Sequence, residues 1–596
     1  MQEYSSPATF DVPPTAALPD AVTEHAARTP ERVALSRKVG DRWAPVTSAE
    51  FASQVTDLAR GMIAAGVQAG DRVGILSRTR YEWTLSDYAV WTAGGVPVPI
   101  YETSSAEQAQ WILSDSGAVA VVVENAAHQA LVESVRAELP GLREVWQIEA
   151  GDLDAVSARG DGVGPEQLAE RRATLSVDSL ATIIYTSGTT GRPKGCALTH
   201  GNLLYVAELA PTVIPSMTDT DASSLLFLPL AHVFARIIEI SCVQNGARLG
   251  HTSDLADLLT DLDTFKPTFL VAVPRVFEKV YNGARQKAHA GGKGAIFDRA
   301  ERVAVSWSKA QDAGGPGLLL NLQHKLFDAL VYGKLRAAMG GEVRYALSGG
   351  APLGERLGHF FRGIGVTILE GYGLTETSGP ATVSGPDALK VGTVGRPAPD
   401  SAVRIAEHGE ILVRGPQVFP GYWNNEKATA ETMRDGWFAT GDVGEIDADG
   451  YVRITGRIKE LIVTAGGKNV SPAVLEDAIR AHPLVSQCMV VGDNRPFIGA
   501  LITLDVEALP GWLESKGRPA GTALTELAHD PEVVAEIQAA VETANGRVSK
   551  AESIRSFEIL PTEWTVEGGQ LTPSLKLKRS VVMKEFADEV EKIYAG

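Results

Sequence analysis

The sequence is poor in cysteine, and this shortage excludes two classes of protein. Its 596 residues include three cysteines, Cys196, Cys242 and Cys488. Three scattered thiols are too few for a disulfide framework or a cysteine metal cluster. We therefore expect each of them to be a small, buried apolar side chain.

Long hydrophobic runs are also missing. No stretch reaches the roughly 18 uninterrupted apolar residues of a membrane span. The longest candidate, residues 225–243, is interrupted by a proline and by polar or charged side chains: Pro229, His232, Arg236 and Glu239. Residues 1–14 lack the basic and then apolar pattern of a secretion signal, so we expect a cytoplasmic protein.

Positive charge is scarce as well. Lysine and arginine number 55 against 73 aspartates and glutamates, which gives a net charge of −18. A general nucleic-acid binder normally carries a basic surface, so no nucleic-acid partner is expected. An anionic ligand would need local positive sites. The length exceeds one ordinary hydrophobic core and predicts two or more domains.

Glycine, hydroxyl side chains and a lysine are concentrated at residues 185–195, which read YTSGTTGRPKG. They follow a β-branched run typical of a strand. Glycine lets backbone N–H groups approach an anion, hydroxyls add donors, and Lys194 adds positive charge. A Walker loop needs Gly-Lys-Ser/Thr at the start of a helix, but here Pro193 precedes the lysine and Gly195 follows it. We interpret the stretch as a different polyphosphate loop; an ordinary flexible loop is the alternative.

Strands and helices alternate in the first part of the chain. Apolar strands are predicted at residues 72–76, 96–101 and 118–123, with helices at 83–93 and 106–114 between them. This alternation indicates a largely parallel α/β sheet.

Later strands run directly into glycine turns. Residues 343–347 and 366–369 are strands of this kind, and such junctions suggest one crevice at the strand ends. Residues 223–232 are predicted as a buried strand ending in His232, and residues 283–340 as a helical insertion.

The pattern changes after residue 392 to short strands and tight turns, and a smaller module is expected after Arg457. In that module Ser471 is placed to cap a helix with Pro472 at its first position.

Five separated motifs between residues 185 and 576 resemble, in this order, the adenylate-forming superfamily of acyl-CoA synthetases, firefly-type luciferases and peptide-synthetase adenylation domains. The chain looks most like the bacterial long-chain fatty-acyl-CoA synthetases. This rests on LPLAH at 228–232, the insertion at 283–340 and LTPSLK at 571–576.

The resemblance implies an α/β protein with two domains. Residues 1–457 would form doubly wound α/β subdomains plus a small β-barrel-like subdomain. Residues 458–596 would form a small, mobile α+β domain that carries the adenylation lysine. The implied substrates are a long-chain fatty acid, ATP and CoA, with Mg²⁺ as the metal.

The implied reaction has two steps. The fatty-acid carboxylate attacks the α-phosphate of ATP, giving acyl-AMP and pyrophosphate, and the CoA thiol then attacks acyl-AMP, giving acyl-CoA and AMP. Because phosphate is a poor target for an anion, the protein must neutralise charge and align the reactants.

The phosphate and metal residues follow from the resemblance. The loop would wrap the β- and γ-phosphates, and Thr375 would reach the α-phosphate. Mg²⁺ would be held by the Thr186 hydroxyl and the Glu376 carboxylate; the lesser alternative for Glu376 is a solvated loop glutamate. The assigned phosphate residues are Thr186, Ser187, Gly188, Thr189, Thr190, Gly191 and Lys194.

The residues that would recognise the nucleoside also follow from the resemblance. Tyr372 would stack on adenine, and Asp442 would accept hydrogen bonds from the ribose hydroxyls beside Arg457. Without the other motifs, Tyr372 is equally an aromatic that fills a turn. The other residues that the resemblance assigns to nucleotide binding are Gly349, Gly350, Ala351, Glu370, Gly371 and Gly373.

The resemblance makes Lys576 the adenylation lysine, although a lysine here is otherwise a solvated tail charge. The C-terminal domain would rotate about Lys459 between the two steps. His232 would lie where the acyl and CoA tunnels meet, or would be a hydrogen-bonded core histidine. The residues then near CoA would be Gly466, Gly467 and Lys468.

Arg236 departs from the family pattern, because some long-chain members place a tryptophan gate four residues after the histidine. Chain length and fatty-acid entry therefore stay open. Residues 225–240 and 269–280 are either the walls of an apolar tunnel or plain core.

Other functions are weighed against this one. A fatty acyl-AMP ligase that loads a carrier protein is the nearest, but residues 458–472 carry no extra insertion. No feature of the sequence points to a luciferase-type oxygenase. A non-catalytic fatty-acid-binding relative is disfavoured because the charged motif residues are all present. Pathway, oligomeric state and any peripheral membrane contact stay open.

Overall fold

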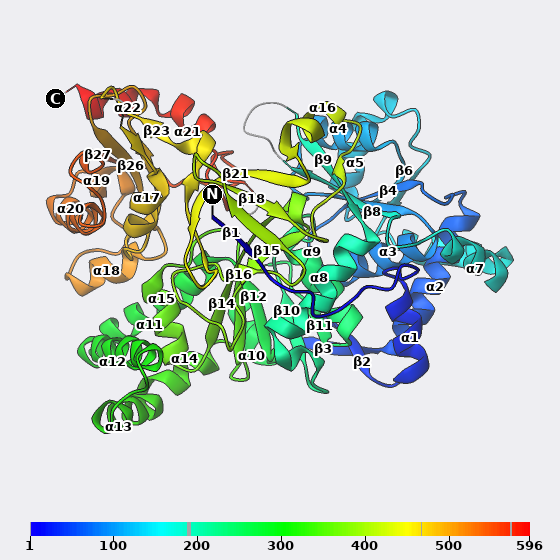
Figure 1. The fold of residues 1–596 in the computed structure, drawn as a ribbon, viewed down its shortest axis with the longest axis horizontal. Helices are drawn as coiled ribbons and strands as arrows, with labels where there is room; N and C mark the ends of the chain where they lie inside the picture. Colours follow the sequence, from blue (N-terminus) through cyan, green and yellow to red (C-terminus); the bar gives the residue numbers. More distant parts are fainter. Residues whose placement is uncertain (1, 187–191, 255, 467, 573–574, 596) are drawn as a thin grey trace.

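The computed structural model describes residues 2–186, 192–254, 256–466, 468–572 and 575–595. Several residues assigned above lie outside the described part: Ser187, Gly188, Thr189, Thr190, Gly191 and Gly467. Figure 1 shows a large N-terminal part, coloured blue to yellow, with a smaller orange and red C-terminal part at one end.

The first sheet is parallel throughout, with strand order β5-β4-β6-β7. Its strands are β4 (Arg72–Leu76), β5 (Val96–Ile100), β6 (Ala118–Val123) and β7 (Glu144–Gln147). Helices α3 (Tyr81–Thr92) and α4 (Ala106–Ser116) form crossovers. β4, β5 and β6 are buried along nearly their whole length, as in a sheet covered on both faces. The predicted parallel α/β layout is confirmed.

A second sheet has the order β10-β11-β2-β3. It consists of β2 (Val33–Val39), β3 (Arg42–Thr47), β10 (Ser223–Leu226) and β11 (Arg248–His251). The strand predicted to reach His232 was too long, because β10 ends at Leu226. The Thr79 hydroxyl donates to Leu228 O at 2.7 Å and accepts from Leu230 N at 3.1 Å, which turns the chain there. His232 instead precedes helix α9 (Val233–Asn245).

The third sheet has the order β12-β13-β14-β15-β16 and carries the glycine turns. Its strands are β12 (Phe269–Ala272), β13 (Tyr345–Ser348), β14 (Thr367–Leu374), β15 (Gly379–Val383) and β16 (Arg396–Pro397). The first three are parallel, and β15 and β16 continue the sheet in antiparallel pairing.

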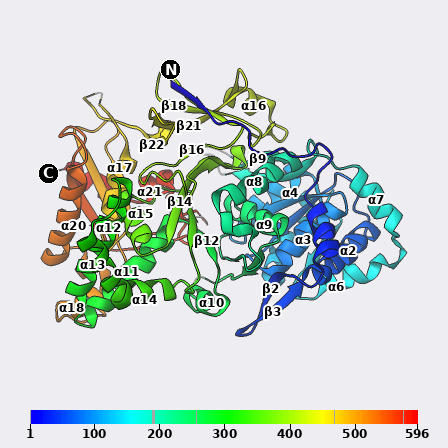
Figure 2. The ribbon, with the colours of Figure 1, turned by 60° about the horizontal axis from the view of Figure 1, so that its bottom comes forward.

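The chain between β12 and β13 is helical, as predicted for residues 283–340, although the first helix already begins at Pro274; that the segment is an insertion stays a prediction. Its helices are α11 (Pro274–Ala290), α12 (Gly294–Asp312), α13 (Leu318–Phe327), the π-helix η4 (Asp328–Tyr332) and α14 (Gly333–Ala337). In Figures 1 and 2 they gather on the side near the C-terminal part, away from α1 (Asp20–Arg28) and α2 (Ser48–Ala64). None of these helices, nor any other in the described part of the chain, is both long and apolar enough to cross a membrane.

Two antiparallel sheets complete the N-terminal part. One joins β8 (Leu180–Thr186), β9 (Lys194–Thr199) and β19 (Gly421–Tyr422). The other has the path β1-β17-β18-β21-β20, with β22 on β21. Its strands are β1 (Gln2–Ser5), β17 (Ala402–Ile405), β18 (Glu410–Arg414), β20 (Met433–Arg434), β21 (Trp437–Ile446) and β22 (Val452–Arg457). The barrel-like subdomain is thus an open sheet within the described residues.

The C-terminal part is built on β25 (Val485–Val491), β26 (Ile498–Leu504) and β27 (Ile554–Leu560), with α17 (Pro472–Arg480) and α20 (Pro531–Asn545). Among the described residues, each hydrophobic core cluster lies wholly on one side of residue 458. The domain boundary at 457/458 stays a prediction. Helix α17 begins at Pro472 as predicted, but the predicted cap is wrong: the Ser471 hydroxyl donates to Thr455 O at 2.7 Å.

Candidate active site

The glycine turns after β13 and within β14 bring the backbone close to neighbouring segments. A Cβ at Gly349 would lie 3.2 Å from the Phe234 ring, and a Cβ at Gly373 would lie 1.7 Å from Gly379 O. Gly350 has φ +83°, which glycine adopts without strain. Glycine at these positions is therefore required by packing and turn geometry before any ligand is considered.

Tyr372, Asp442 and Arg457 form one hydrogen-bonded group. The Tyr372 hydroxyl donates to Asp442 Oδ2 at 2.7 Å, and Arg457 Nε donates to Asp442 Oδ1 at 2.7 Å. Asp442 and Arg457 are paired residues of β21 and β22, so backbone register places them together. Burial and the Asp442 charge raise the pKa of Tyr372 well above its usual value. Since a carboxylate has about four lone-pair sites, Asp442 can still accept from a diol.

Lys576 comes from the C-terminal tail and lies beside this group. Its backbone N–H donates to Thr572 Oγ1 at 3.0 Å and its carbonyl accepts from Thr572 N at 2.8 Å, which forms a tight turn. Lys576 is exposed by surface area, although many protein atoms surround its side chain. Burial and the Arg457 charge lower its pKa, while the Asp442 and Glu460 charges act in the opposite direction. Lys576, from the C-terminal part, is thus near enough to Arg457 and Asp442 of the N-terminal part for their charges to affect its pKa.

His232 caps helix α9, and the charge of Lys576 contributes to lowering its pKa. Its Nδ1 accepts a hydrogen bond from Phe234 N at 3.1 Å, so a proton on the neutral ring belongs on Nε2. Burial, with the Lys576 charge, lowers the pKa of His232 to about 3. The imidazole is therefore neutral at physiological pH. It is a helix-capping histidine whose pKa also reflects the charge of Lys576.

Glu376 lies in the 3₁₀ turn Thr375–Thr377 and contacts strand β19 of the small sheet that contains β8 and β9. Its Oε1 accepts from the Tyr422 hydroxyl at 2.7 Å, and Lys194 Nζ lies 5.1 Å from the centre of the Tyr422 ring. Tyr422 pairs with Cys196 across β19 and β9, and the Thr186 hydroxyl lies 3.9 Å from Cys196 Sγ. Tyr422 was missed from the sequence, because a tyrosine in a two-residue strand carries no motif.

This donor set fits Mg²⁺ that is held largely by a polyphosphate. The described residues contain no group of three or more histidine, cysteine, aspartate or glutamate side chains that could hold a metal alone. Within the same residues, Glu376 Oε2 has no hydrogen-bond partner. Mg²⁺ typically takes one or two protein carboxylates and completes its shell with phosphate oxygens and water. Glu376 with the Thr186 hydroxyl meets that requirement.

Two further assigned residues are buried at β14. Thr375 follows the strand in a 3₁₀ turn. Glu370 accepts from Leu353 N at 3.2 Å, and burial raises its pKa to about 7. Gly371, between them, contributes backbone pairing with Val383. Glu370 therefore ties β14 to the turn that follows β13.

The residues assigned to the hinge and to CoA lie on the C-terminal part. Lys459 is exposed in the short helix Ile458–Glu460. Gly466 is exposed, and Lys468 Nζ pairs with Glu552 at 3.2 Å. Among the described contacts, none joins Lys468 or Gly466 to Lys576 or the Tyr372 group.

Arg236 is fully buried and is held by α3. Its Nη2 pairs with Asp87 at 2.8 Å, and its guanidinium lies 5.4 Å from the Trp91 ring centre. Burial raises the pKa of Asp87 to about 6 and that of Glu239 well above its ordinary value. The position that some relatives use as a gate therefore holds a buried ion pair here.

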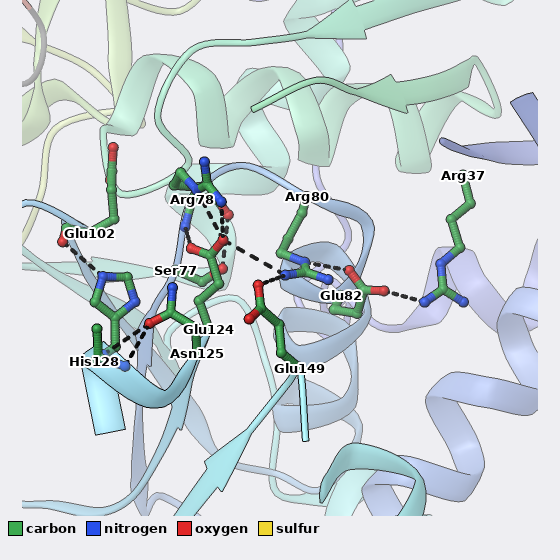
Figure 3. Close-up of polar contacts among 11 residues, drawn as sticks. Arg37, Ser77, Arg78, Arg80, Glu82, Glu102, Glu124, Asn125, His128 and Glu149 are labelled. Carbon is green, nitrogen blue, oxygen red and sulfur yellow. Dashed lines mark hydrogen bonds and ion pairs between the residues drawn. The ribbon is translucent and has the colours of Figure 1, made fainter. Parts of the chain in front are cut away.

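The carboxyl edge of the first sheet is also charged (Figure 3). Arg78 Nε donates to Glu124 at 2.9 Å, and Arg80 Nε donates to Glu82 at 2.6 Å. Arg80 also faces Glu149 at 3.8 Å. Because these arginines are engaged by carboxylates, this edge is not a ready anion site.

Two family models match the chain. The model described as AMP-binding enzyme matches residues 22–423, and the AMP-binding enzyme C-terminal domain matches residues 459–596. The long-chain-fatty-acid–CoA ligase FadD15 of Mycobacterium tuberculosis is 53% identical over 597 residues, covering 100% of both proteins.

Solved structures share the fold. The A domain of carboxylic acid reductase from Segniliparus rugosus, solved with AMP and a co-purified carboxylic acid, has a TM-score of 0.75 and 21% identity, covering 97% of this chain and 94% of that chain. The O-succinylbenzoate coenzyme A synthetase of Bacillus subtilis, solved with ATP and a magnesium ion, has a TM-score of 0.67 and 22% identity, covering 94% and 98%. The family models and the full-length similarity to FadD15 show that the chain belongs to the AMP-binding enzyme family.

Proposed function

We propose that this protein is an ATP-dependent long-chain-fatty-acid–CoA ligase. The relative that carries this name is similar over the entire chain. The observation that carries the proposal is the position of Lys576, which interacts electrostatically with Arg457, Asp442 and His232 although it comes from the C-terminal tail. A site closed by a cation from a second domain suits a reaction between two anions.

In the first step, Lys576 would neutralise the fatty-acid carboxylate and the α-phosphate as they approach. Asp442, oriented by Tyr372 and Arg457, would hold the ribose. Lys194 would bind phosphate oxygens. Mg²⁺ at Glu376 and Thr186 would supply the remaining neutralisation of the β- and γ-phosphates.

In the second step, CoA must reach the acyl-AMP. Gly466 and Lys468 lie on the C-terminal part without a contact to Lys576 among the described residues, so a rotation near Lys459 would be needed to bring them in. His232, neutral with its proton on Nε2, would offer a hydrogen-bond donor at the junction without adding charge.

A coupled assay across acids from acetate to oleate, with CoA present or omitted, tests the reaction. We expect acyl-CoA and AMP from long-chain acids. Pyrophosphate release without CoA thioester would support the carrier-loading alternative. No release with any acid would overturn the proposal.

Lys576→Ala tests the role of the lysine. We expect acyl-AMP formation from acid and ATP to fall by about 10³-fold, since removing one electrostatic stabiliser typically costs 10²–10³. Thioester formation from supplied acyl-AMP should change little, because the charge is no longer needed. Lys578→Ala, a lysine on the same tail, is the matched control. Equal loss of both steps in Lys576→Ala would sink the assignment.

A further inference from the structure

Helix α13 and the following η4 expose a continuous row of leucines, which we call the leucine face. Its members are Leu318, Leu319, Leu322, Leu326 and Leu330, with exposed fractions between 50% and 87%. Four of them are spaced four residues apart, so they lie along one side of the helix. Single exposed apolar residues are ordinary, but a contiguous row marks an interaction surface.

The opposite side of the same helices is firmly packed. Phe327 and Tyr332 are buried, and the Tyr332 hydroxyl donates to Ala300 O at 2.7 Å. The Trp307 indole donates to Asn321 Oδ1 at 2.9 Å, and the His324 ring lies 2.6 Å from Gly363 O. The leucine face is therefore the outer side of a well-anchored element.

The charge around this face differs in sign from the rest of the protein. Residues 283–340 hold nine lysines and arginines and four acidic residues, whereas the whole chain has a net charge of −18. All four acidic side chains are in ion pairs, two of them with arginines outside the segment: Asp298 with Arg285, Asp328 with Arg336, Glu301 with Arg356 and Asp312 with Arg362.

The basic side chains of this segment are mostly free. Seven are exposed and form no ion pair within the described part of the chain: Lys287, Lys293, Arg299, Arg302, Lys309, Lys325 and Lys334. Lys325 lies within α13, next to the leucine face in helical projection. The segment thus offers an aliphatic row with Lys325 beside it, on a helical region that carries further uncompensated positive charge.

We infer that the leucine face docks on an anionic lipid surface. Aliphatic side chains bordered by lysine and arginine are the composition of helices that lie in the membrane interface. A second copy of this chain would bring two positive faces together in a symmetric contact, which opposes such a dimer. Protein interfaces are enriched in aromatic residues, and none belongs to this face.

The reason for a contact between the leucine face and a lipid surface rests on the proposed function. Long-chain fatty acids partition into bilayers, so an enzyme held on the lipid surface meets its substrate there. Vesicle binding needs no catalysis, however. Failure of the docking and failure of the ligase assignment are therefore observed separately.

Co-sedimentation with phosphatidylcholine vesicles, with and without phosphatidylglycerol, tests the inference. We expect binding to the anionic vesicles, weakened by salt because the electrostatic part is screened. The double variant L322Q/L326Q should bind about tenfold more weakly, because it removes two of the inserted apolar side chains. K325E/K334E should lose the preference for the anionic vesicles.

Leu259→Gln is the matched control, because Leu259 is 57% exposed on another helix. It should bind vesicles as the unmodified protein does. All variants should keep the ligase activity of the unmodified protein on a long-chain acid that is supplied in detergent micelles without vesicles. Equal vesicle binding by L322Q/L326Q would overturn the inference. So would absence of binding by the unmodified protein, or a dimer in sedimentation velocity that L322Q/L326Q abolishes.

Discussion

At the scale of single residues, the burial of Glu370 makes the stability of the folded protein depend on pH. Its carboxyl is buried, accepts one backbone hydrogen bond from Leu353 N, and has a pKa of about 7 against an ordinary value of 4.5. Between these two pH values the unfolded chain releases a proton that the folded protein keeps. The folded state therefore loses stability as the pH rises from 4.5 to 7.

Glu370→Gln should remove this dependence. The free energy of unfolding of the variant, relative to the unmodified protein, should rise by at most about 3 kcal/mol between pH 4.5 and 7 and stay constant above pH 8. Urea unfolding at a series of pH values measures it. A difference that is flat across the series would contradict the raised pKa.

Sequence motifs identified the charged residues of the candidate site, but the side chains that contact them were visible only in the structure. Asp442 and Lys576 were assigned from the sequence, and in the structure the Asp442 charge acts on the pKa of Lys576. Tyr422 was not found, because its hydrogen bond to Glu376 depends on strand β19 pairing with β9. Such a partner is visible only once strand pairing is known.

At the scale of elements, one ion pair joins α3 to α9. Arg236 and Asp87 are both fully buried, so neither charge has water as a substitute partner. A buried charge that loses its partner is costly, whereas a neutral pair of similar volume is often tolerated.

Arg236→Met should lower the free energy of unfolding by about 3–5 kcal/mol, because Asp87 would be left as an uncompensated buried carboxylate. The double variant Asp87→Asn with Arg236→Met should recover most of that loss. Urea unfolding of both variants gives the comparison. Equal destabilisation of the single and double variants would show that packing of Arg236, rather than its charge, matters.

The ends of helices and strands follow less directly from the local sequence than their presence does. The parallel strands β4, β5 and β6 were located well, since each is an apolar run between helical segments. Strand β10 was predicted six residues too long, because the Thr79 hydroxyl that turns the chain is 149 residues away from Leu228. Contacts between distant segments leave no trace in a local pattern.

At the scale of the whole molecule, two ion pairs hold the C-terminal part against α11. Arg275 pairs with Asp505 at 2.6 Å, and Lys279 Nζ lies 3.0 Å from Glu507 Oε1. Both contacts accompany the orientation in which Lys576 lies at the site. If rotation precedes the thioester step, these pairs must break first.

Cross-linking tests this requirement. The native cysteines are all buried, so Lys279→Cys with Glu507→Cys can be bridged selectively by a short bis-maleimide. The bridged protein should form acyl-AMP but release no acyl-CoA, whereas each single variant treated with the reagent should do both. Thioester formation at an unchanged rate by the bridged protein would show that no rotation is needed.

Strand β1 has a consequence for how the chain folds. Gln2–Ser5 pairs with Ala402–Ile405, and Arg404 Nε donates to Glu3 at 2.8 Å, 401 residues away in sequence. During synthesis this strand emerges long before its partner, and contacts of such separation form slowly. The first parallel sheet can assemble while synthesis continues, but β1 stays without its partner until β17 has been made.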